Sequence, residues 1–385
     1  MFTRTNKEIE YILNTVLIAA PDGNVYTEFA NYVGQRWLFP EKDAKMSYNL
    51  FSPNTVKGKI FKILLPYFKH SKILRNAASA SSIKIKLSDL FHSFICDIFS
   101  IDSFSYAIFE GSPCVHQKIT IQIYKGDIIY GYCKLSMNPD IVDIFEAEQR
   151  SLDRLNHLSN KLHIPKCLYC GTIEQNINCF VQTTELTKRS KVVNQITDLH
   201  WDFMSILHEN TCQDIKFEDS DFYNMLIDFM HLIEKKDSKT SQFLKLQIEI
   251  VLQEYSDQGC RFSIYHGDFT PWNCFVEQDK LFVYDFEYLR ETYPPFLDYF
   301  HFFTQSCIYQ KRLGSEDIFK QYLSNMNQIM LKFDYPNKNY KYYLLHIIHF
   351  YMRREQNSDN ELIDRDIATW VEILKLLNIY DKSNK

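Results

Sequence analysis

The sequence lacks the features that define several large classes of protein. Of its 385 residues, 43 are Lys or Arg and 48 are Asp or Glu, so the formal net charge is −5. Without an excess of basic charge there is no general electrostatic case for binding nucleic acid. The apolar stretch at residues 11–20 is interrupted by Asn14 and Thr15. It is too short to cross a bilayer.

The ten cysteines are scattered along the sequence. Because no secretory signal is visible either, we expect reduced cysteines and a cytoplasmic protein. Cys167 and Cys170 form a single Cys-x-x-Cys pair. A structural zinc site would need two further ligands at suitable spacing, and apart from the distant Cys179 none is near. We therefore interpret the pair as thiols within a strand.

What the sequence does contain is a group of polar residues between short apolar runs. The candidate catalytic residues His266, Asp268 and Asn273 have the His-x-Asp-x4-Asn spacing of a kinase catalytic loop, and Asp285 ends a later apolar run. Phosphoryl transfer requires a carboxylate aimed at the attacking hydroxyl and oxygen ligands for Mg²⁺. Asp268 suits the first role, whereas Asn273 and Asp285 suit the second. We expect His266 to brace the loop backbone.

A spacing this short also occurs by chance, so its context matters. The second carboxylate lies twelve residues beyond Asn273, at the end of a third apolar run. Residues 266–273 and 284–287 together resemble the aminoglycoside phosphotransferase and choline kinase superfamily, the small-molecule branch of the protein-kinase-like fold. Two departures from protein kinases favour that branch: Gly267 replaces an Arg, and Glu287 replaces the Gly of Asp-Phe-Gly. In addition, no activation segment follows.

The resemblance implies an α+β, bilobal protein-kinase-like fold. It would have a small antiparallel-sheet amino-terminal lobe, a mainly helical carboxy-terminal lobe and an extra amino-terminal region. We expect an extension of unclear fold at residues 1–100, a nucleotide-covering lobe at 101–186 and a helical lobe with the catalytic loop and acceptor pocket at 187–385. Within the extension we expect a strand that ends at a turn formed by residues 21–23. Asp298 would brace the catalytic loop, with a plain helix-start role as the alternative.

Lys134 and Glu148 are the nucleotide residues that the resemblance implies most directly. Lys134 ends the third expected strand of the lobe and would hold the α- and β-phosphates of ATP. Glu148 follows on a helix whose apolar stripe includes Leu152 and Leu155, and it would pair with Lys134. Glu146 is the rival for that pairing.

The expected phosphate loop, residues 111–116, matches the family less well. Gly111 stands alone where kinases have three glycines, and Pro113 lacks a backbone N–H. The role could instead depend on Lys118 or Gln117. Glu185, at the expected hinge to the larger lobe, would offer backbone groups to adenine.

The implied activity is ATP- and Mg²⁺-dependent phosphorylation of a hydroxyl on a small molecule. A kinase for polycationic aminoglycosides would be expected to line its pocket with clustered carboxylates, whereas the carboxy-terminal charges here are mixed. A sugar or glycan intermediate is therefore our first candidate, and an aminoglycoside or amino-alcohol (choline-like) acceptor is the alternative. A nucleotide-binding pseudokinase or scaffold also stays open because the phosphate loop is degenerate, and a protein kinase is a weaker interpretation. The sequence does not distinguish ATP from GTP as the nucleotide, and it does not indicate an oligomeric state.

A basic segment at residues 57–75 is the last feature of note. It carries five lysines and one arginine among apolar residues. A basic amphipathic helix can lie on an anionic membrane, so peripheral membrane contact is one interpretation. A solvated face of a helix packed on the kinase lobe is the other.

Overall fold

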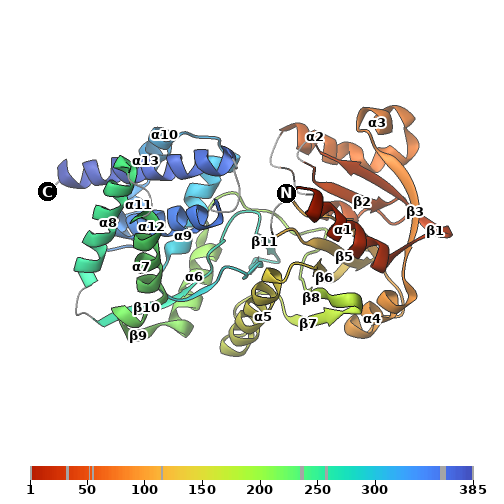
Figure 1. Ribbon diagram of the computed structural model, residues 1–385, viewed down its shortest axis with the longest axis horizontal. Helices are drawn as coiled ribbons and strands as arrows, with labels where there is room; N and C mark the ends of the chain where they lie inside the picture. Colours follow the sequence, from red (N-terminus) through yellow and green to blue (C-terminus); the bar gives the residue numbers. More distant parts are fainter. Residues whose placement is uncertain are drawn as a thin grey trace. The chain divides into compact units, whose positions relative to one another are not determined.

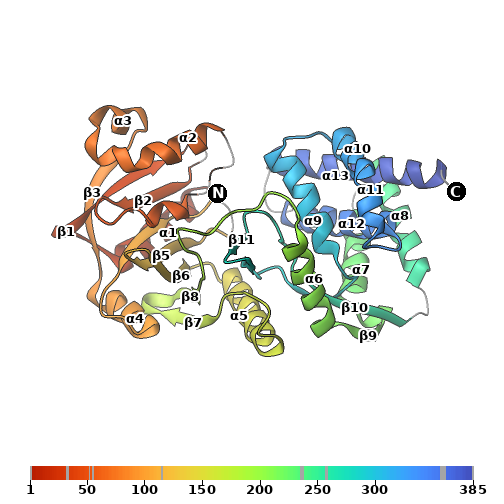
Figure 2. The same cartoon turned by 180° about the vertical axis from the view of Figure 1, so that it is seen from behind.

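The computed structural model describes residues 2–31, 34–51, 53, 56–113, 116–234, 238–255, 259–355 and 361–383. The chain forms two compact units. The first comprises Met1–Val192 and Cys274–Glu287, and the second comprises Val193–Asn273 and Tyr288–Lys385. Figures 1 and 2 show the elements of each unit from opposite sides.

An antiparallel sheet of eight strands forms the centre of the first unit, in the order β3-β1-β2-β4-β5-β6-β8-β7. The strands are β1 (Leu17–Ala30), β2 (Arg36–Pro40), β3 (Ser81–Leu87), β4 (Ser105–Phe109), β5 (Ile119–Lys125), β6 (Ile128–Ser136), β7 (Cys167–Ile173) and β8 (Ile177–Thr183). A two-stranded sheet of β11 (Cys274–Glu277) and β12 (Lys280–Val283) completes the strands of this unit. The first hundred residues thus share one continuous sheet with the strands that carry Lys134.

Helices cover both faces of the amino-terminal strands. Those of the first unit are α1 (Phe2–Val16), η1 (Ser47–Leu50), α2 (Val56–Leu64), η2 (Leu65–His70), α3 (Lys72–Ala77), α4 (Asp89–Phe99), α5 (Asp140–Leu158) and η3 (Glu174–Asn176). Successive side chains of a strand point to opposite faces. Accordingly, Trp37 and Phe39 of β2 belong to one hydrophobic cluster, together with apolar residues of α2 and η2. Leu38 belongs to a second hydrophobic cluster, together with apolar residues of α1 and α4.

The strand expected to end at residues 21–23 was predicted with wrong bounds. The chain is helical as far as Val16, because Ile12 and Val16 are at helical spacing and buried in the second cluster. β1 then runs through residues 21–23, and its pairing with β3 shifts register between Ala19 and Asn24. The turn residues therefore form an irregularity inside a strand. Across the described residues, no helix is long and apolar enough to span a membrane.

The second unit is mainly helical. Its elements are α6 (Asp198–Thr211), β9 (Gln213–Lys216), η4 (Phe217–Asp219), α7 (Asp221–Glu234), α8 (Lys239–Tyr255), β10 (Gly259–Tyr265), β13 (Arg290–Tyr293), α9 (Leu297–Gln305), the π-helical η5 (Ser306–Gln310), α10 (Ser315–Ser324), α11 (Met326–Met330), α12 (Pro336–Glu355) and α13 (Glu361–Ser383). A small sheet of order β13-β10-β9 delivers the chain to the predicted catalytic loop. Aromatic rings fill much of the core: Tyr340 lies 5.1 Å from Phe300 and 4.7 Å from Tyr322, between ring centres.

Candidate active site

The predicted catalytic loop, residues 266–273, follows β10 in the second unit. Gly267 has a φ of +85°, which L side chains rarely adopt, and a Cβ added there would lie 2.3 Å from the carbonyl oxygen of Tyr288. Only glycine fits this position without displacing the backbone. The glycine that stands where protein kinases have Arg therefore has a steric cause in this chain.

Asp298 of α9 fixes the start of the loop. Its carboxylate accepts hydrogen bonds from the backbone N–H of His266 at 3.0 Å and of Gly267 at 3.3 Å. Burial raises the pKa of Asp298 to about 7, although these two N–H groups act in the opposite direction. Asp298 also lies in the first turn of α9, where an acidic side chain suits a helix start. The brace that the resemblance implied is thus present, and the position of Asp298 in the first turn fits the helix-start role as well.

His266 and Asn273 hold the two ends of the loop around Asp268. The backbone N–H of Asp268 donates to Nδ1 of His266 at 3.1 Å, so His266 contacts the loop backbone as expected. The amide nitrogen of Asn273 donates to the backbone oxygen of Asp268 at 2.9 Å and to its Oδ2 at 2.7 Å. Because the nitrogen of Asn273 is used in this way, its oxygen is the atom suited to a metal ion.

His301 of α9 is a further residue at this loop, and the sequence reasoning missed it. Its Nε2 lies 3.2 Å from Oδ1 of Asp268, and its side chain is 4% exposed. His301 follows Asp298 by three residues, so the two side chains lie on neighbouring positions of one helix face. That spacing alone does not identify His301, because its contact with Asp268 depends on how α9 packs against the loop.

Lys134 of β6 lies between two carboxylates in the first unit. Its Nζ is 2.9 Å from Glu148 of α5 and 3.0 Å from Asp285. Burial by itself lowers the pKa of Lys134, but Asp285 and Glu148 outweigh that effect and raise it, so the lysine stays charged. Glu146, the rival for this pairing, is half exposed and pairs with Arg150 at 3.4 Å. The pairing of Lys134 with Glu148 is therefore present, while its role toward a nucleotide stays a prediction.

A second ion pair, between Lys118 and Glu287, adds to this cluster. Carboxylate oxygens of Glu148, Asp285 and Glu287 lie within 4.8 Å of one another. Such oxygens are the ligands that Mg²⁺ prefers, and three carboxylates against two lysines leave one net negative charge for a cation. Asp285 also has a φ of +71°. A left-handed conformation in a non-glycine residue costs about 1–3 kcal/mol and is concentrated at functional sites.

Comparison with protein-family models finds no match, and comparison with curated protein sequences finds none either. Solved structures do match. A thermostable mutant of aminoglycoside phosphotransferase APH(4)-Ia in its apo form aligns with 74% of this chain and 97% of its own, with a TM-score of 0.50 and 11% identity. A ternary complex of that thermostable enzyme with ADP and hygromycin B gives the same values. The streptomycin-ATP complex of APH(2")-IIa aligns with 75% of this chain and 99% of its own at 13% identity, but its TM-score is only 0.44.

The chain has the fold of an aminoglycoside phosphotransferase. The α+β, kinase-like fold predicted from the sequence is thereby confirmed. At 11% identity the likeness concerns the fold, so the chemistry has to be argued from the residues themselves.

Within the phosphotransferase fold, Gly111 follows β4 and opens the predicted phosphate loop. Its φ is +78°, and a Cβ there would lie 2.3 Å from the backbone oxygen of Lys118. Gln117 donates its side-chain amide to the backbone oxygen of Glu110 at 2.8 Å and so holds the loop rather than facing outward from it. Residues 114–115 of the loop lie outside the described part. The role of Gly111 in phosphate binding stays a prediction.

Glu185 follows β8, where the hinge was expected. Its side chain is about half exposed and lies 3.6 Å from Nδ1 of His163. The predicted contact with adenine uses backbone groups, and nothing about this side chain conflicts with it. The assignment stays a prediction.

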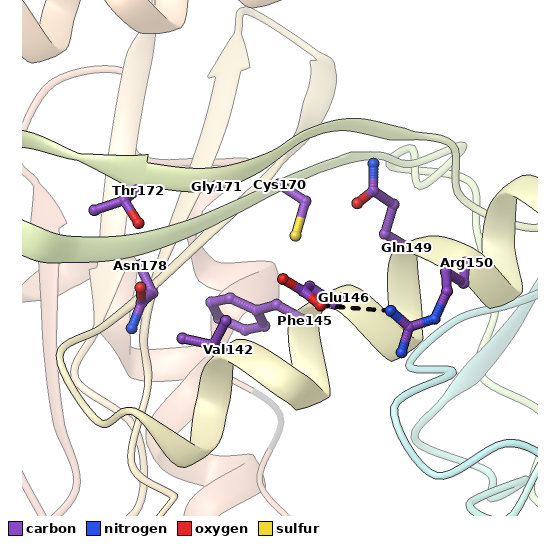
Figure 3. Close-up of a pocket in the computed structure, with 9 residues that line it drawn as sticks. All are labelled: Val142, Phe145, Glu146, Gln149, Arg150, Cys170, Gly171, Thr172 and Asn178. Carbon is purple, nitrogen blue, oxygen red and sulfur yellow. Dashed lines mark hydrogen bonds and ion pairs between the residues drawn. The ribbon is translucent and has the colours of Figure 1, made fainter.

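Figure 3 shows a pocket between α5 and the hairpin of β7 and β8, and its lining includes Glu146, Arg150 and Cys170. Apart from Glu146, the rival that pairs with Arg150 instead, none of the described candidate residues lines it. Burial raises the pKa of Cys167 to about 12 and that of Cys170 to about 11. Both residues lie within β7, as the interpretation of this pair as thiols within a strand expects.

Proposed function

We propose that the chain is an ATP- and Mg²⁺-dependent phosphotransferase that phosphorylates a hydroxyl group of a small molecule. The observation that supports it best is the position of Lys134 between Glu148 and Asp285. A buried lysine held by two carboxylates is costly to maintain for stability alone. The same arrangement holds a positive point charge ready for phosphate oxygens.

Asp268 is the proposed base for the acceptor hydroxyl. Its two carboxylate oxygens are contacted by Asn273 and His301, so the plane of the carboxylate is fixed before a substrate arrives. A carboxylate held in this way can orient the hydroxyl and accept its proton as the phosphoryl group is transferred. Most of the rate enhancement would come from positioning and charge stabilisation.

Asp285 and Asn273 are the proposed Mg²⁺ ligands, and Glu287 is a further carboxylate of the Asp285 cluster. The ion would supply positive charge to the nucleotide phosphates. Gly111 and the backbone of Glu185 are proposed for the phosphates and the adenine, respectively.

The acceptor is proposed to be a sugar or glycan intermediate rather than a polycation. Two acidic side chains near the carboxy-terminal helices are engaged with basic ones. Asp228 lies 2.6 Å from His349 and 2.7 Å from Arg353, and Asp366 lies 2.9 Å from Arg365. Carboxylates that are neutralised internally have less charge to offer to an aminoglycoside or an amino alcohol.

The deciding experiment measures Mg²⁺-dependent ADP release with a panel of sugars, amino alcohols and aminoglycosides. Asp268→Asn should lower kcat by about 10²–10⁴-fold. Asp285→Asn should remove the dependence on Mg²⁺ together with the activity. Asp317→Asn, at an exposed carboxylate of α10, is the matched control and should leave turnover unchanged.

The melting temperature with and without MgATP separates the enzyme from a pseudokinase. A ligand that binds the folded state raises the melting temperature. A shift without turnover for any acceptor would favour the pseudokinase, and the absence of both would overturn nucleotide binding altogether.

A further inference from the structure

The segment formed by α2, η2 and α3 has no part in the proposed reaction. Its inner side packs on the aromatic residues of β1 and β2 through Phe61, Leu64 and Phe68. These residues are spaced i, i+3 and i+7, so they occupy one side of the segment. This side packs the segment against the first unit.

A second set of large apolar side chains on the same segment is exposed. Their exposed fractions are 54% for Ile60, 69% for Ile63, 59% for Tyr67 and 81% for Ile73. Ile60, Ile63 and Tyr67 repeat the i, i+3, i+7 spacing one residue earlier, so they share a different side of the segment from the inner set. α2 and α3 both contact η2, and they lie beside each other in both views (Figures 1 and 2). Exposed apolar side chains concentrated on one short segment are typical of interaction surfaces.

The charged residues along this part of the sequence are of one sign. Between Ala44 and Ser88 the sequence has eight lysines, one arginine and no aspartate or glutamate, in a chain whose net charge is −5. Lys57, Lys59 and Lys72 are exposed, and none of them forms an ion pair with another described residue. We call Lys57, Lys59 and Lys72, together with the four exposed apolar residues, the α2–α3 face.

Arg75 is the exception, because it is used inside the unit. Its guanidinium lies 2.7 Å from Glu41 and donates to the backbone oxygen of Phe68 at 2.8 Å. The positive charge that remains available to a partner therefore comes from the exposed lysines.

We propose that the α2–α3 face docks the chain on an anionic lipid surface. The apolar side chains enter the headgroup region, and the lysines contact the lipid phosphates. The combination of exposed apolar groups with unpaired positive charge selects this partner. A second copy of the chain would place the same lysines against one another, which like-charge repulsion opposes.

The test is co-sedimentation of the full chain with vesicles and needs no catalytic activity, so it is independent of the proposed function. Vesicles of phosphatidylcholine mixed with phosphatidylglycerol are compared with phosphatidylcholine alone, at low and high salt. Each lysine adds about fivefold to binding at an anionic surface. The triple variant Lys57→Gln, Lys59→Gln and Lys72→Gln should therefore bind at least about tenfold more weakly.

The double variant Ile63→Ser and Ile73→Ser should lose binding on the order of tenfold or more through the apolar contribution alone. Two matched control variants lie in the second unit. The lysine control is the triple variant Lys239→Gln, Lys245→Gln and Lys311→Gln, and the apolar control is the double variant Leu246→Ser and Leu331→Ser. All are exposed positions. They should bind like the parent chain, and circular dichroism should show that every variant is folded.

Binding that requires the anionic lipid, weakens with salt and is lost only in the α2–α3 variants would support the proposal. Three results would overturn it: no binding to the mixed vesicles at low salt, equal binding to neutral vesicles, or equal loss in the control variants. Binding to soluble polyglutamate but not to vesicles would also overturn it, in favour of an acidic protein segment. Self-association abolished by the same variants, without vesicle binding, would replace the lipid with a second copy of the chain.

Discussion

His301 Nε2 lies 3.2 Å from Oδ1 of Asp268, and both side chains belong to the second unit. The same helix, α9, carries Asp298, which accepts the backbone N–H groups at the start of the loop. One helix therefore holds both the backbone of the loop and the carboxylate proposed to act on the acceptor. The contact with His301 is the part of this arrangement that bears most directly on the orientation of Asp268.

Replacing His301 by Leu should lower kcat by about 10–100-fold with little change in the KM for ATP. A hydrogen bond to a charged group contributes about 1.5–3 kcal/mol, and here that contribution orients Asp268. His301→Gln, which keeps a donor, should recover part of the loss. His231→Leu, at an exposed position of α7, is the control for a general effect of losing a histidine. An unchanged kcat in His301→Leu would remove the orienting role, and a loss that Gln does not relieve would point to packing instead.

Gly267→Ala should unfold the loop locally and abolish turnover. The added Cβ would meet the carbonyl oxygen of Tyr288, and the φ of +85° is itself unfavourable for alanine. We expect a loss of more than about 2 kcal/mol in the free energy of unfolding, measured by urea denaturation. Gly259→Ala is the control, because a Cβ at Gly259 meets nothing within 4 Å. Equal stability of the two variants would show that the loop tolerates a side chain at Gly267.

The parts of the site that the sequence could predict are those whose residues are close together along the chain. His266, Asp268 and Asn273 lie on one loop, so their spacing alone indicated the chemistry. The pairing of Lys134 with Glu148 was also accessible, because a strand and the next helix place them 14 residues apart.

The contacts that could not be predicted join distant residues. Lys118 and Glu287 are 169 residues apart, and His301 is 33 residues from Asp268. No local pattern distinguishes such a histidine from one that is merely buried, since the contact depends on how α9 packs against the loop. The prediction that the strand ends at residues 21–23 failed for the same reason. The local preference of these residues for a turn was overridden by the pairing of β1 with β3 on both sides of them.

Lys134→Met should destabilise the first unit by about 3–5 kcal/mol, because it leaves Glu148 buried without a partner. The double variant Lys134→Met with Glu148→Leu removes both buried charges and should recover much of that loss. Neither variant should show a rise in melting temperature with MgATP. This combination separates the two roles of the pair, since stability returns in the double variant while nucleotide binding does not. A double variant that still responds to MgATP would contradict the assignment of Lys134 to the nucleotide.

Asp298 should make the stability of the chain depend on pH in a direction opposite to that of an ordinary ion-paired carboxylate. Its pKa is about 7 in the folded chain and 3.8 ordinarily. The folded state therefore holds a proton that the unfolded state has lost between these values. The contribution to stability is complete below about pH 4 and is lost as the pH rises through 7.

Asp298→Asn cannot titrate and also replaces one acceptor oxygen by a donor, so it is destabilised at every pH. Its deficit relative to the parent should be about 2–3 kcal/mol larger at pH 5 than at pH 8. Urea denaturation of both chains at the two pH values measures this difference, with Asp317→Asn as the exposed control. A deficit that is constant with pH, or larger at pH 8, would mean that Asp298 stays ionised in the folded chain and that the two backbone N–H groups outweigh its burial.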